Sequence, residues 1–253
     1  MILVIAGALA VAMIVLIEAG QRAGVRHLAK LPDEATTSNT VVDAAIFGLM
    51  GLLLAFTFSG AASRWEWRRS LVVQEANNIG TAYLRLDLLP SEHQPKLRET
   101  FRQYVAARLA IYRKLPDIKA AREELERSGV IQDRLWREVV SAAKETQNPA
   151  VMNLVVANVN EMLDITTTRT AATEAHLPNH VFVMLAATVL ASSLLVGYGM
   201  AGNRQRSWIH IATYTILLSV SVYLILELEY PRLGFIRLDS ADELLARELA
   251  KMK

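Results

Sequence analysis

The chain has 253 residues, of which 53% are hydrophobic, and it carries 27 basic and 25 acidic residues, so its apolar and charged residues must be segregated along the sequence. A net charge of +2, without a basic stripe, argues against a nucleic-acid-binding protein. The absence of cysteine excludes disulfides, thiolate chemistry and cysteine-ligated metal sites.

Four segments contain no Asp, Glu, Lys or Arg, namely 2–17, 44–63, 181–203 and 207–226. The last three have about 20 residues or more, which is enough for a helix to cross a hydrocarbon core of about 30 Å. The first is shorter and is also compatible with a signal peptide. Because nothing basic precedes it and Glu18-Ala19-Gly20 is a poor cleavage site, we predict a retained helix.

Four crossings divide the chain into 1–63 with the first two spans, an extramembrane insertion at 64–178, 179–229 with the last two spans, and a tail at 230–253. The predicted fold class is an all-α integral membrane protein with four transmembrane helices and an inserted helical domain. The distribution of basic residues near the span ends favours a cytoplasmic location for the insertion and for both termini. They are Arg22, Arg26, Lys30, Arg204 and Arg206 on the loop side, against Arg64, Arg68, Arg69, Arg169, Arg232, Arg237 and Arg247 on the insertion side.

Helix breakers in the insertion are few and are spaced at helix length, which predicts about five helices. These breakers are Pro90, Pro116, Ser128-Gly129, Pro149 and Pro178. Ser91 and Gln94 have the spacing of a capping box. Apolar residues then recur at intervals of three and four, as one buried helix face requires. They are Leu97, Phe101, Tyr104, Val105, Leu109, Tyr112 and Leu115.

No breaker separates Ala44 from Leu89, so the second span is predicted to continue out of the membrane as one long helix ending at Pro90. Winding this helix at about 100° per residue gathers small, hydroxylated and amide side chains within an arc of roughly 80°. Phe47, Leu54 and Phe58 lie on the opposite side. The arc contains Gly48, Leu52, Phe56, Ser59 and Ser63 in the span, and Glu66, Ser70, Gln74, Asn77 and Thr81 beyond it.

Two interpretations of this arc remain open. Small and hydroxylated residues in a span are typical of tight helix packing. The same residues are also typical of a helix that lines an aqueous pore, which for a four-span subunit requires a ring with this helix near the symmetry axis. In such a ring Leu52 and Phe56 would form a hydrophobic constriction, and Ser59 and Ser63 would hydrate the adjoining section.

Several motifs resemble a known family. The run LLAFTFSGAASRWEWRR at 53–69 is similar to the second-span signature of bestrophin channels, which matches at Phe56, Ala61, Arg64 and Trp65. The chain resembles still more closely the bacterial bestrophin-like family, formerly a domain of unknown function, from about 43 to 238. The motifs that carry this resemblance are VQEANNIGTAYLRLDLLP at 73–90, NEMLD at 160–164, TRT at 168–170, YLILELE at 223–229 and PRLG at 231–234.

The resemblance implies a homopentameric ion channel in the bacterial inner membrane. Its second span would line a chloride-permeable pore with a hydrophobic neck, in which Gly48, Leu52 and Phe56 face the axis. The sequence departs from the family pattern at Thr57, Ser59 and Ser63, where bacterial bestrophins tend to carry Arg, Asn and Asp. Gly48 would also widen the neck.

Charged residues near the membrane boundary have alternative roles. Arg64, Arg68 and Glu75 share a third face of the long helix, where they form a structural clamp or, alternatively, a basic vestibule for anions. Glu66, on the arc, would oppose anion entry and favour cations. A further acidic set could hold a cation as in animal bestrophins, or pair with Arg232, Arg237 and Arg247. That set is Glu227, Glu229, Asp239, Asp242 and Glu243.

We expect no cofactor, no metal site and no enzymatic activity, because the sequence has no HExxH motif, phosphate-binding glycine loop or nucleophile elbow. His176 and His180 are separated by Pro178, which breaks their helical geometry. The sequence thus predicts a pore-forming subunit that contacts the lipid bilayer, self-associates as a ring and passes small inorganic ions, with anions favoured by the resemblance. The alternatives are a membrane-anchored scaffold or sensor whose helical domain binds a protein partner, and a small-solute transporter, which lacks support from paired broken spans.

Overall fold

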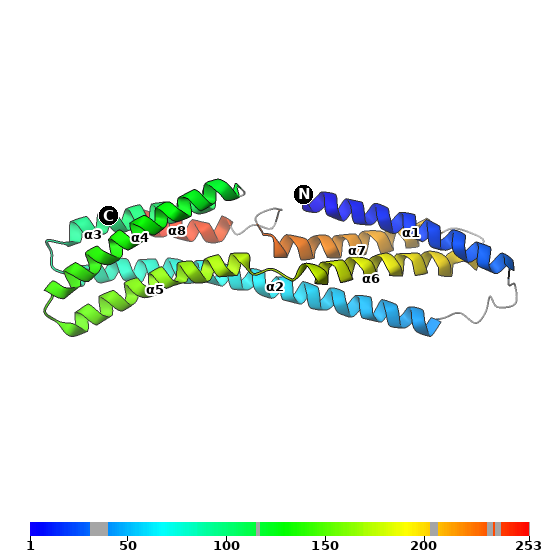
Figure 1. Ribbon diagram of the computed structural model, residues 1–253, viewed down its shortest axis with the longest axis horizontal. Coiled ribbons are helices and arrows are strands. Elements are labelled where there is room, and N and C mark those ends of the chain that lie inside the picture. The colour runs from blue at the N-terminus through cyan, green and yellow to red at the C-terminus, as the bar shows by residue number, and fades with distance from the viewer. Residues whose placement is uncertain (31–39, 115–116, 203–206, 232–234, 236–238, 253) are drawn as a thin grey trace. The chain divides into compact units, whose positions relative to one another are not determined.

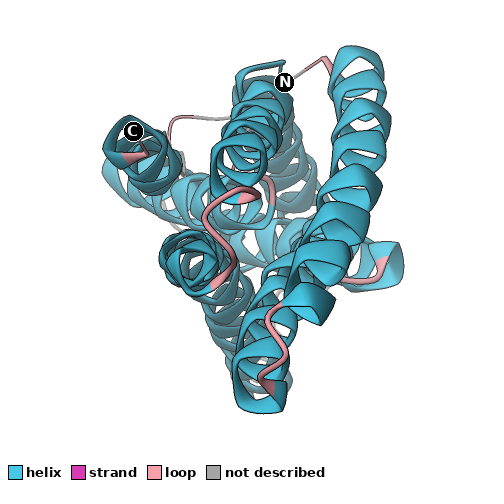
Figure 2. Cartoon of the chain, turned by 90° about the vertical axis from the view of Figure 1, so that its left-hand side faces the viewer, coloured by secondary structure: helices cyan, strands magenta, loops and turns pink. Residues whose placement is uncertain are grey.

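A computed structural model describes residues 1–30, 40–114, 117–202, 207–231, 235 and 239–252. The described residues form helices and connecting loops, with no strand among them (Figure 2). The all-α fold class is therefore confirmed. The helices are α1 Ile2–Lys30, α2 Thr40–Arg85, α3 Gln94–Lys114, α4 Ile118–Glu145, α5 Pro149–Glu174, α6 Asn179–Gly199, α7 Trp208–Glu229 and α8 Asp239–Lys251, with 3-10 turns η2 Leu86–Leu88 and η3 Met200–Gly202.

Among the described residues, four helical segments are long and apolar enough to cross a membrane, as the sequence predicts. They are α1, the apolar part of α2, the α6 portion of Pro149–Gly202, and α7. Helix α1 has 29 residues and continues well beyond the charge-free segment, to a helix length of about 43 Å at 1.5 Å per residue. Leu115, Pro116, Arg204, Arg206, Arg232 and Arg237 lie outside the described residues.

The chain forms two compact units, and α2 passes from one into the other (Figure 1). The first unit, here called the span unit, comprises Met1–Arg64 and His176–Phe235. The second, here called the helical unit, comprises Trp65–Ala175 and Ile236–Lys253. Helix α8, in the segment 230–253 that the sequence predicts to be a tail, lies in the helical unit and buries Leu245 completely in its core.

In the span unit, α1 packs against α6 and α7. The contact with α6 is made backbone to backbone, since a Cβ atom at Gly197 would overlap the Ile17 carbonyl and one at Gly20 would overlap the Leu194 carbonyl. Small residues that let helix backbones approach closely are typical of membrane helix pairs. Around this contact the span unit has an apolar core of Met13, Met50, Ala61, Leu185, Val189, Leu218, Val222 and Ile225.

In the helical unit, α3 packs against α4 and α8, and α4 packs against α5. The predicted buried face of α3 is confirmed from Leu97 to Leu109, and Tyr112 packs partly buried against the same core. Edge-to-face contacts join Tyr83 of α2 to Phe101, with ring centroids 5.5 Å apart, and Phe101 to Tyr104 at 6.5 Å.

Two local predictions in the helical unit are wrong. Ser128-Gly129 does not break the chain, so that α4 is one helix where two were expected. A glycine costs about 1 kcal/mol inside a helix, and burial of Leu135, Val139 and Ala142 on the same helix outweighs that cost. The expected capping box is not formed either, because the Gln94 amide donates to the Leu89 carbonyl at 2.8 Å.

Helix α2 runs without interruption for 46 residues. It ends at Arg85, where η2 follows, and Leu89 is extended with φ −84° and ψ 159°. That extended conformation is the one required of a residue before proline, here Pro90. One continuous helix therefore contains residues of both the second span and the helical unit.

Candidate functional site

The outward face of α2 is the candidate functional site. Its ten predicted residues are exposed in the single chain, and we call them the α2 stripe. They are Gly48, Leu52, Phe56, Ser59, Ser63, Glu66, Ser70, Gln74, Asn77 and Thr81. In contrast Met50, Thr57 and Ala61 are buried within the span unit. These buried residues lie roughly 180° around the helix from the stripe, so the part of the stripe in the span unit faces away from the other described helices of that unit.

Within the span unit the stripe carries two large apolar side chains that the described residues leave more than half exposed. Phe56 is 67% exposed and Leu52 is 52% exposed. Phe47 and Leu54 pack against the span-unit core, whereas Phe58, on another side of the helix, is 46% exposed. Thr57 turns its hydroxyl back to its own helix and donates to the Leu53 carbonyl at 2.7 Å.

The part of the stripe in the helical unit is polar. Ser70 donates to the Trp67 carbonyl at 2.8 Å, and Glu66 lies 3.6 Å from Arg69, one turn along the helix. Both members of that pair are more than half exposed, so the pair is worth little in water. Glu66 is the one charged residue among the ten.

The opposite face of α2 is held by three charged residues, each inside its own unit. In the span unit, Arg64 donates to Glu229 Oε2 from Nε at 3.0 Å and from Nη2 at 2.9 Å. Glu229 is fully buried at the end of α7, and its Oε1 accepts the Leu177 backbone N–H at 2.7 Å. His176 Nδ1 is 3.5 Å from the same oxygen, and its ring stacks on Tyr230. Arg64 thus joins the end of the second span to α7 beside the segment that precedes α6.

Arg68, in the helical unit, closes the C-terminus of α5. Its Nε donates to the Ala172 carbonyl at 2.9 Å and its Nη2 donates to the Ala175 carbonyl at 2.7 Å. The last carbonyls of a helix have no partner within the helix and carry its partial negative charge. A buried guanidinium therefore satisfies them and is itself satisfied.

Glu75 lies at the centre of a buried ion cluster. Its Oε1 accepts from Arg108 Nε of α3 at 2.7 Å, and its Oε2 accepts from Arg169 Nη1 of α5. Both arginines approach the Tyr112 ring, with Arg169 4.2 Å from its centroid. Burial raises the pKa of the Glu75 carboxyl, but the two guanidinium groups lower it by more, and its pKa is below the ordinary value. The cluster connects α2 to α3 and α5.

Sequence reasoning missed the partners of these residues. The sequence analysis places Arg169 only among the basic residues on the insertion side, and it does not single out Arg108. A signal was present in the spacing of buried residues along α5. They recur at intervals of four and three, and Arg169 is next in that series. These residues are Val155, Val159, Met162 and Thr166. Arg108 continues the series Leu97, Phe101 and Tyr104 of α3 in the same way.

The acidic residues after the last span pair only in part as the sequence suggested, and the side chains of Asp239 and Asp242 lie outside the described ones. Glu229, proposed either as a cation ligand or as a partner of nearby arginines, has both oxygens occupied by Arg64 and the Leu177 N–H. Arg247 pairs with Glu243, one turn earlier in α8, at 3.5 Å, as the second alternative expected. A buried carboxylate with both oxygens bonded is a structural group.

Comparison with known proteins finds a matching family and solved structures with a similar fold. The sequence matches the family described as Bestrophin-like domain over residues 6–242. No curated protein matches it. Among solved structures, a point variant of a bacterial Bestrophin homolog from Klebsiella pneumoniae has a TM-score of 0.73 at 14% identity, covering 96% of this chain and 99% of that one. A second variant of that homolog has a TM-score of 0.71 at 16% identity, with 96% of each chain covered.

Proposed function

The chain belongs to the Bestrophin-like domain family and is an ion-channel-like, multi-pass membrane protein with the bestrophin fold, and on that premise we propose that it is a subunit of a homopentameric channel whose pore is lined by the α2 stripe. The pore passes small inorganic ions. The observation that carries this proposal is the direction of the stripe. All ten of its residues are exposed, and its part in the span unit lies on the side of α2 opposite the buried residues.

Ring assembly explains why this face is uncovered. A single four-span subunit encloses no channel, so a pore must form where copies of one helix meet around a symmetry axis. Phe56 and Leu52 would then form an apolar neck that controls conduction by excluding water, and Ser59 and Ser63 would hydrate ions beside it. If the stripe served instead to pack spans within the subunit, Phe56 would be buried there, whereas it is 67% exposed.

The ion pairs on the opposite face support the same assignment. Arg64, Arg68 and Glu75 direct their charges into the protein, where each is bonded. They are therefore anchors of α2 in this proposal, and Glu66 is the only formal charge that the stripe presents to permeating ions. The family resemblance favours anions, while a ring of Glu66 carboxylates favours cations, so the sign of the permeant ion is a property that the channel experiment measures.

We place the protein in the bacterial inner membrane, with the helical unit and both termini in the cytoplasm. The basic residues at the start of the helical unit, Arg68 and Arg69, support this orientation.

The test is the current across planar bilayers that contain the purified full chain in asymmetric KCl. We expect current from the wild type, with a reversal potential that gives the sign of the permeant ion. Phe56→Ala removes the largest side chain of the neck, so we expect its conductance to increase severalfold. Glu66→Gln should shift the reversal potential toward anions if the carboxylate ring acts on permeating ions.

Phe58→Ala is the matched control. It removes the same side chain from the same helix, and it is also an exposed position, but it lies outside the stripe. Equal effects of the two substitutions would contradict a neck at Phe56. Silence of folded, oligomeric wild-type protein would favour the second candidate, a membrane-anchored scaffold or sensor whose helical unit binds a protein partner.

A further inference from the structure

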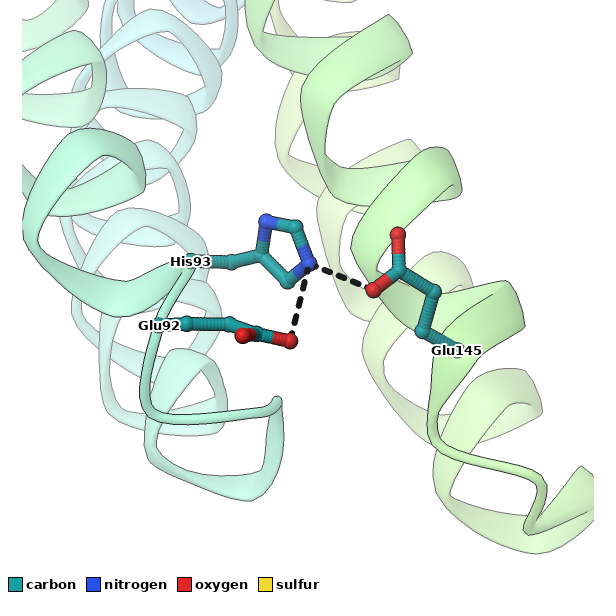
Figure 3. A group of neighbouring side chains, drawn as sticks. All are labelled: Glu92, His93 and Glu145. Carbon is teal, nitrogen blue, oxygen red and sulfur yellow. Dashed lines mark hydrogen bonds and ion pairs between the residues drawn. The ribbon is translucent and has the colours of Figure 1, made fainter.

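Three metal-ligating side chains meet in the helical unit, away from the α2 stripe. Figure 3 shows Glu92 and His93, in the turn before α3, next to Glu145 at the end of α4. His93 Nε2 is 2.7 Å from Glu145 Oε2 and 3.9 Å from Glu92 Oε1. One ligand atom from each residue lies within 4.8 Å of the other two. Fifty-two residues separate His93 from Glu145, so no local spacing in the sequence indicates the group.

The backbone on both sides of the group is held in place. The His93 N–H donates to the Pro90 carbonyl at 3.0 Å, and the Leu97 N–H donates to the His93 carbonyl at 3.1 Å. On the other side, Thr146 caps α4 by donating from Oγ1 to the Ala143 carbonyl at 2.8 Å. Hydrogen bonds therefore hold the backbone of the turn and of the helix end, while the carboxylate side chains of Glu92 and Glu145 are exposed and accessible to a ligand.

The charges of the group indicate a cation. Neighbouring carboxylates pair with basic residues, Asp87 with Arg98 and Glu138 with Lys96. Within the described part of the chain, neither Glu92 nor Glu145 has an ion pair with a lysine or arginine. Glu145 is also the last residue of α4, where the helix carbonyls add partial negative charge. Two carboxylates are thus gathered at a negative helix end around one imidazole.

We propose that Glu92, His93 and Glu145 bind a divalent transition-metal ion of the Zn²⁺ type. An imidazole nitrogen with two carboxylate oxygens is a ligand set that Zn²⁺, Co²⁺ or Ni²⁺ accepts, whereas Ca²⁺ and Mg²⁺ prefer oxygen alone. Tetrahedral bonds of about 2.0 Å place ligand atoms about 3.3 Å apart, a separation that lies between the 2.7 Å and 3.9 Å found here. Water would fill the fourth position.

Such an ion would connect the turn after α2 to the end of α4. It would bind the folded helical unit and not the unfolded chain, and binding of that kind stabilises the fold. The site does not involve the α2 stripe, so it stands or falls independently of the proposed channel.

The experiment is titration of metal-stripped, full-length protein in detergent with Zn²⁺, followed by isothermal calorimetry and by the thermal unfolding midpoint. We expect one Zn²⁺ per chain and a higher midpoint. Co²⁺ in place of Zn²⁺ should give the visible absorption of a four-coordinate site. His93→Ala and the isosteric Glu145→Gln should each weaken Zn²⁺ affinity by about tenfold or more and remove the rise in midpoint.

His180→Ala is the control, because His180 is an exposed histidine in the span unit. It should bind Zn²⁺ like the wild type. The proposal is overturned if the wild type binds no Zn²⁺, or if His93→Ala and Glu145→Gln, with unchanged circular dichroism, bind it as the wild type does. Loss of binding in His180→Ala alone would also overturn it, by locating the ion elsewhere.

Discussion

Glu75 carries a charge at a position with no exposure to solvent, and this is possible because two arginines from two other helices bond its two oxygens. Desolvation of three buried charges is costly, and attraction within the cluster offsets that cost only while all three members are present. Glu75 therefore restricts how the helices pack, because both of its oxygens are bonded only when α2, α3 and α5 meet in one arrangement.

Replacing Glu75 by Gln should destabilise the protein strongly. Arg108 and Arg169 would remain buried without a countercharge, and breaking a buried pair in this way costs about 3–5 kcal/mol. The measurement is the thermal unfolding midpoint in detergent. Glu66→Gln, on the exposed side of the same helix, should leave the midpoint unchanged. Similar midpoints for the two variants would show that the cluster does not stabilise the fold.

The same cluster predicts how stability depends on pH. The pKa of Glu75 is lowered from its ordinary value of 4.5, so the unfolded chain takes up this proton at a higher pH than the folded protein does. The stabilisation is complete above about pH 4.5 and is lost as the pH falls below that value, through the folded pKa. The difference in unfolding midpoint between wild type and Glu75→Gln should accordingly shrink in acid. A constant difference would contradict the assigned pKa.

At the scale of elements, the contact between α1 and α6 in the span unit depends on glycines, two of which lie against the facing backbone most closely. Gly197 of α6 lies against the Ile17 backbone of α1, and Gly20 of α1 lies against the Leu194 backbone of α6. In the membrane no hydrophobic effect drives helices together, so that van der Waals contact between backbones contributes much of the association. A methyl group at either position would separate the two helices.

Gly197→Ala should therefore destabilise the span unit by about 1–3 kcal/mol, in the range of overpacked cores, although alanine is the better helix former. Gly7→Ala is the control, since a Cβ at Gly7, in α1, meets nothing within 4 Å. Midpoints of unfolding in detergent provide the comparison. A Gly197→Ala protein as stable as Gly7→Ala would mean that α1 and α6 can shift apart at no cost.

At the scale of the whole molecule, the absence of cysteine allows the proposed pore to be mapped directly. Single Cys substitutions at Ser59 and Ser63 would be the only thiols in the chain. Channel current from these variants should fall when a charged, water-soluble thiol reagent is added, because the proposed ring assembly would place both positions in the aqueous path.

Two further positions serve as controls for this mapping. Ala61→Cys is buried in the span unit, and Phe58→Cys is exposed but off the stripe. Neither should lose current. Equal sensitivity of Phe58→Cys and Ser59→Cys would contradict a pore along the stripe.

The sequence by itself determined the features that depend on local pattern. The all-α class and four apolar spans follow from charge-free segments, because an unpaired charge in hydrocarbon is costly. The long α2 and the grouping of its stripe residues follow from uninterrupted helical periodicity and the stop at Pro90. The break expected at Ser128-Gly129 failed because packing outweighed a weak local propensity.

Only the tertiary structure decided which distant residues meet. Glu75 is bonded to arginines 33 and 94 residues away, and Arg64 is bonded to Glu229 at a separation of 165 residues. The group of Glu92, His93 and Glu145 likewise exists only where a turn and a helix end come together. Periodicity assigns a side chain to a face of its own helix. Which charged residues pair depends instead on how the helices pack, and helix packing is set by how all the core side chains fit together.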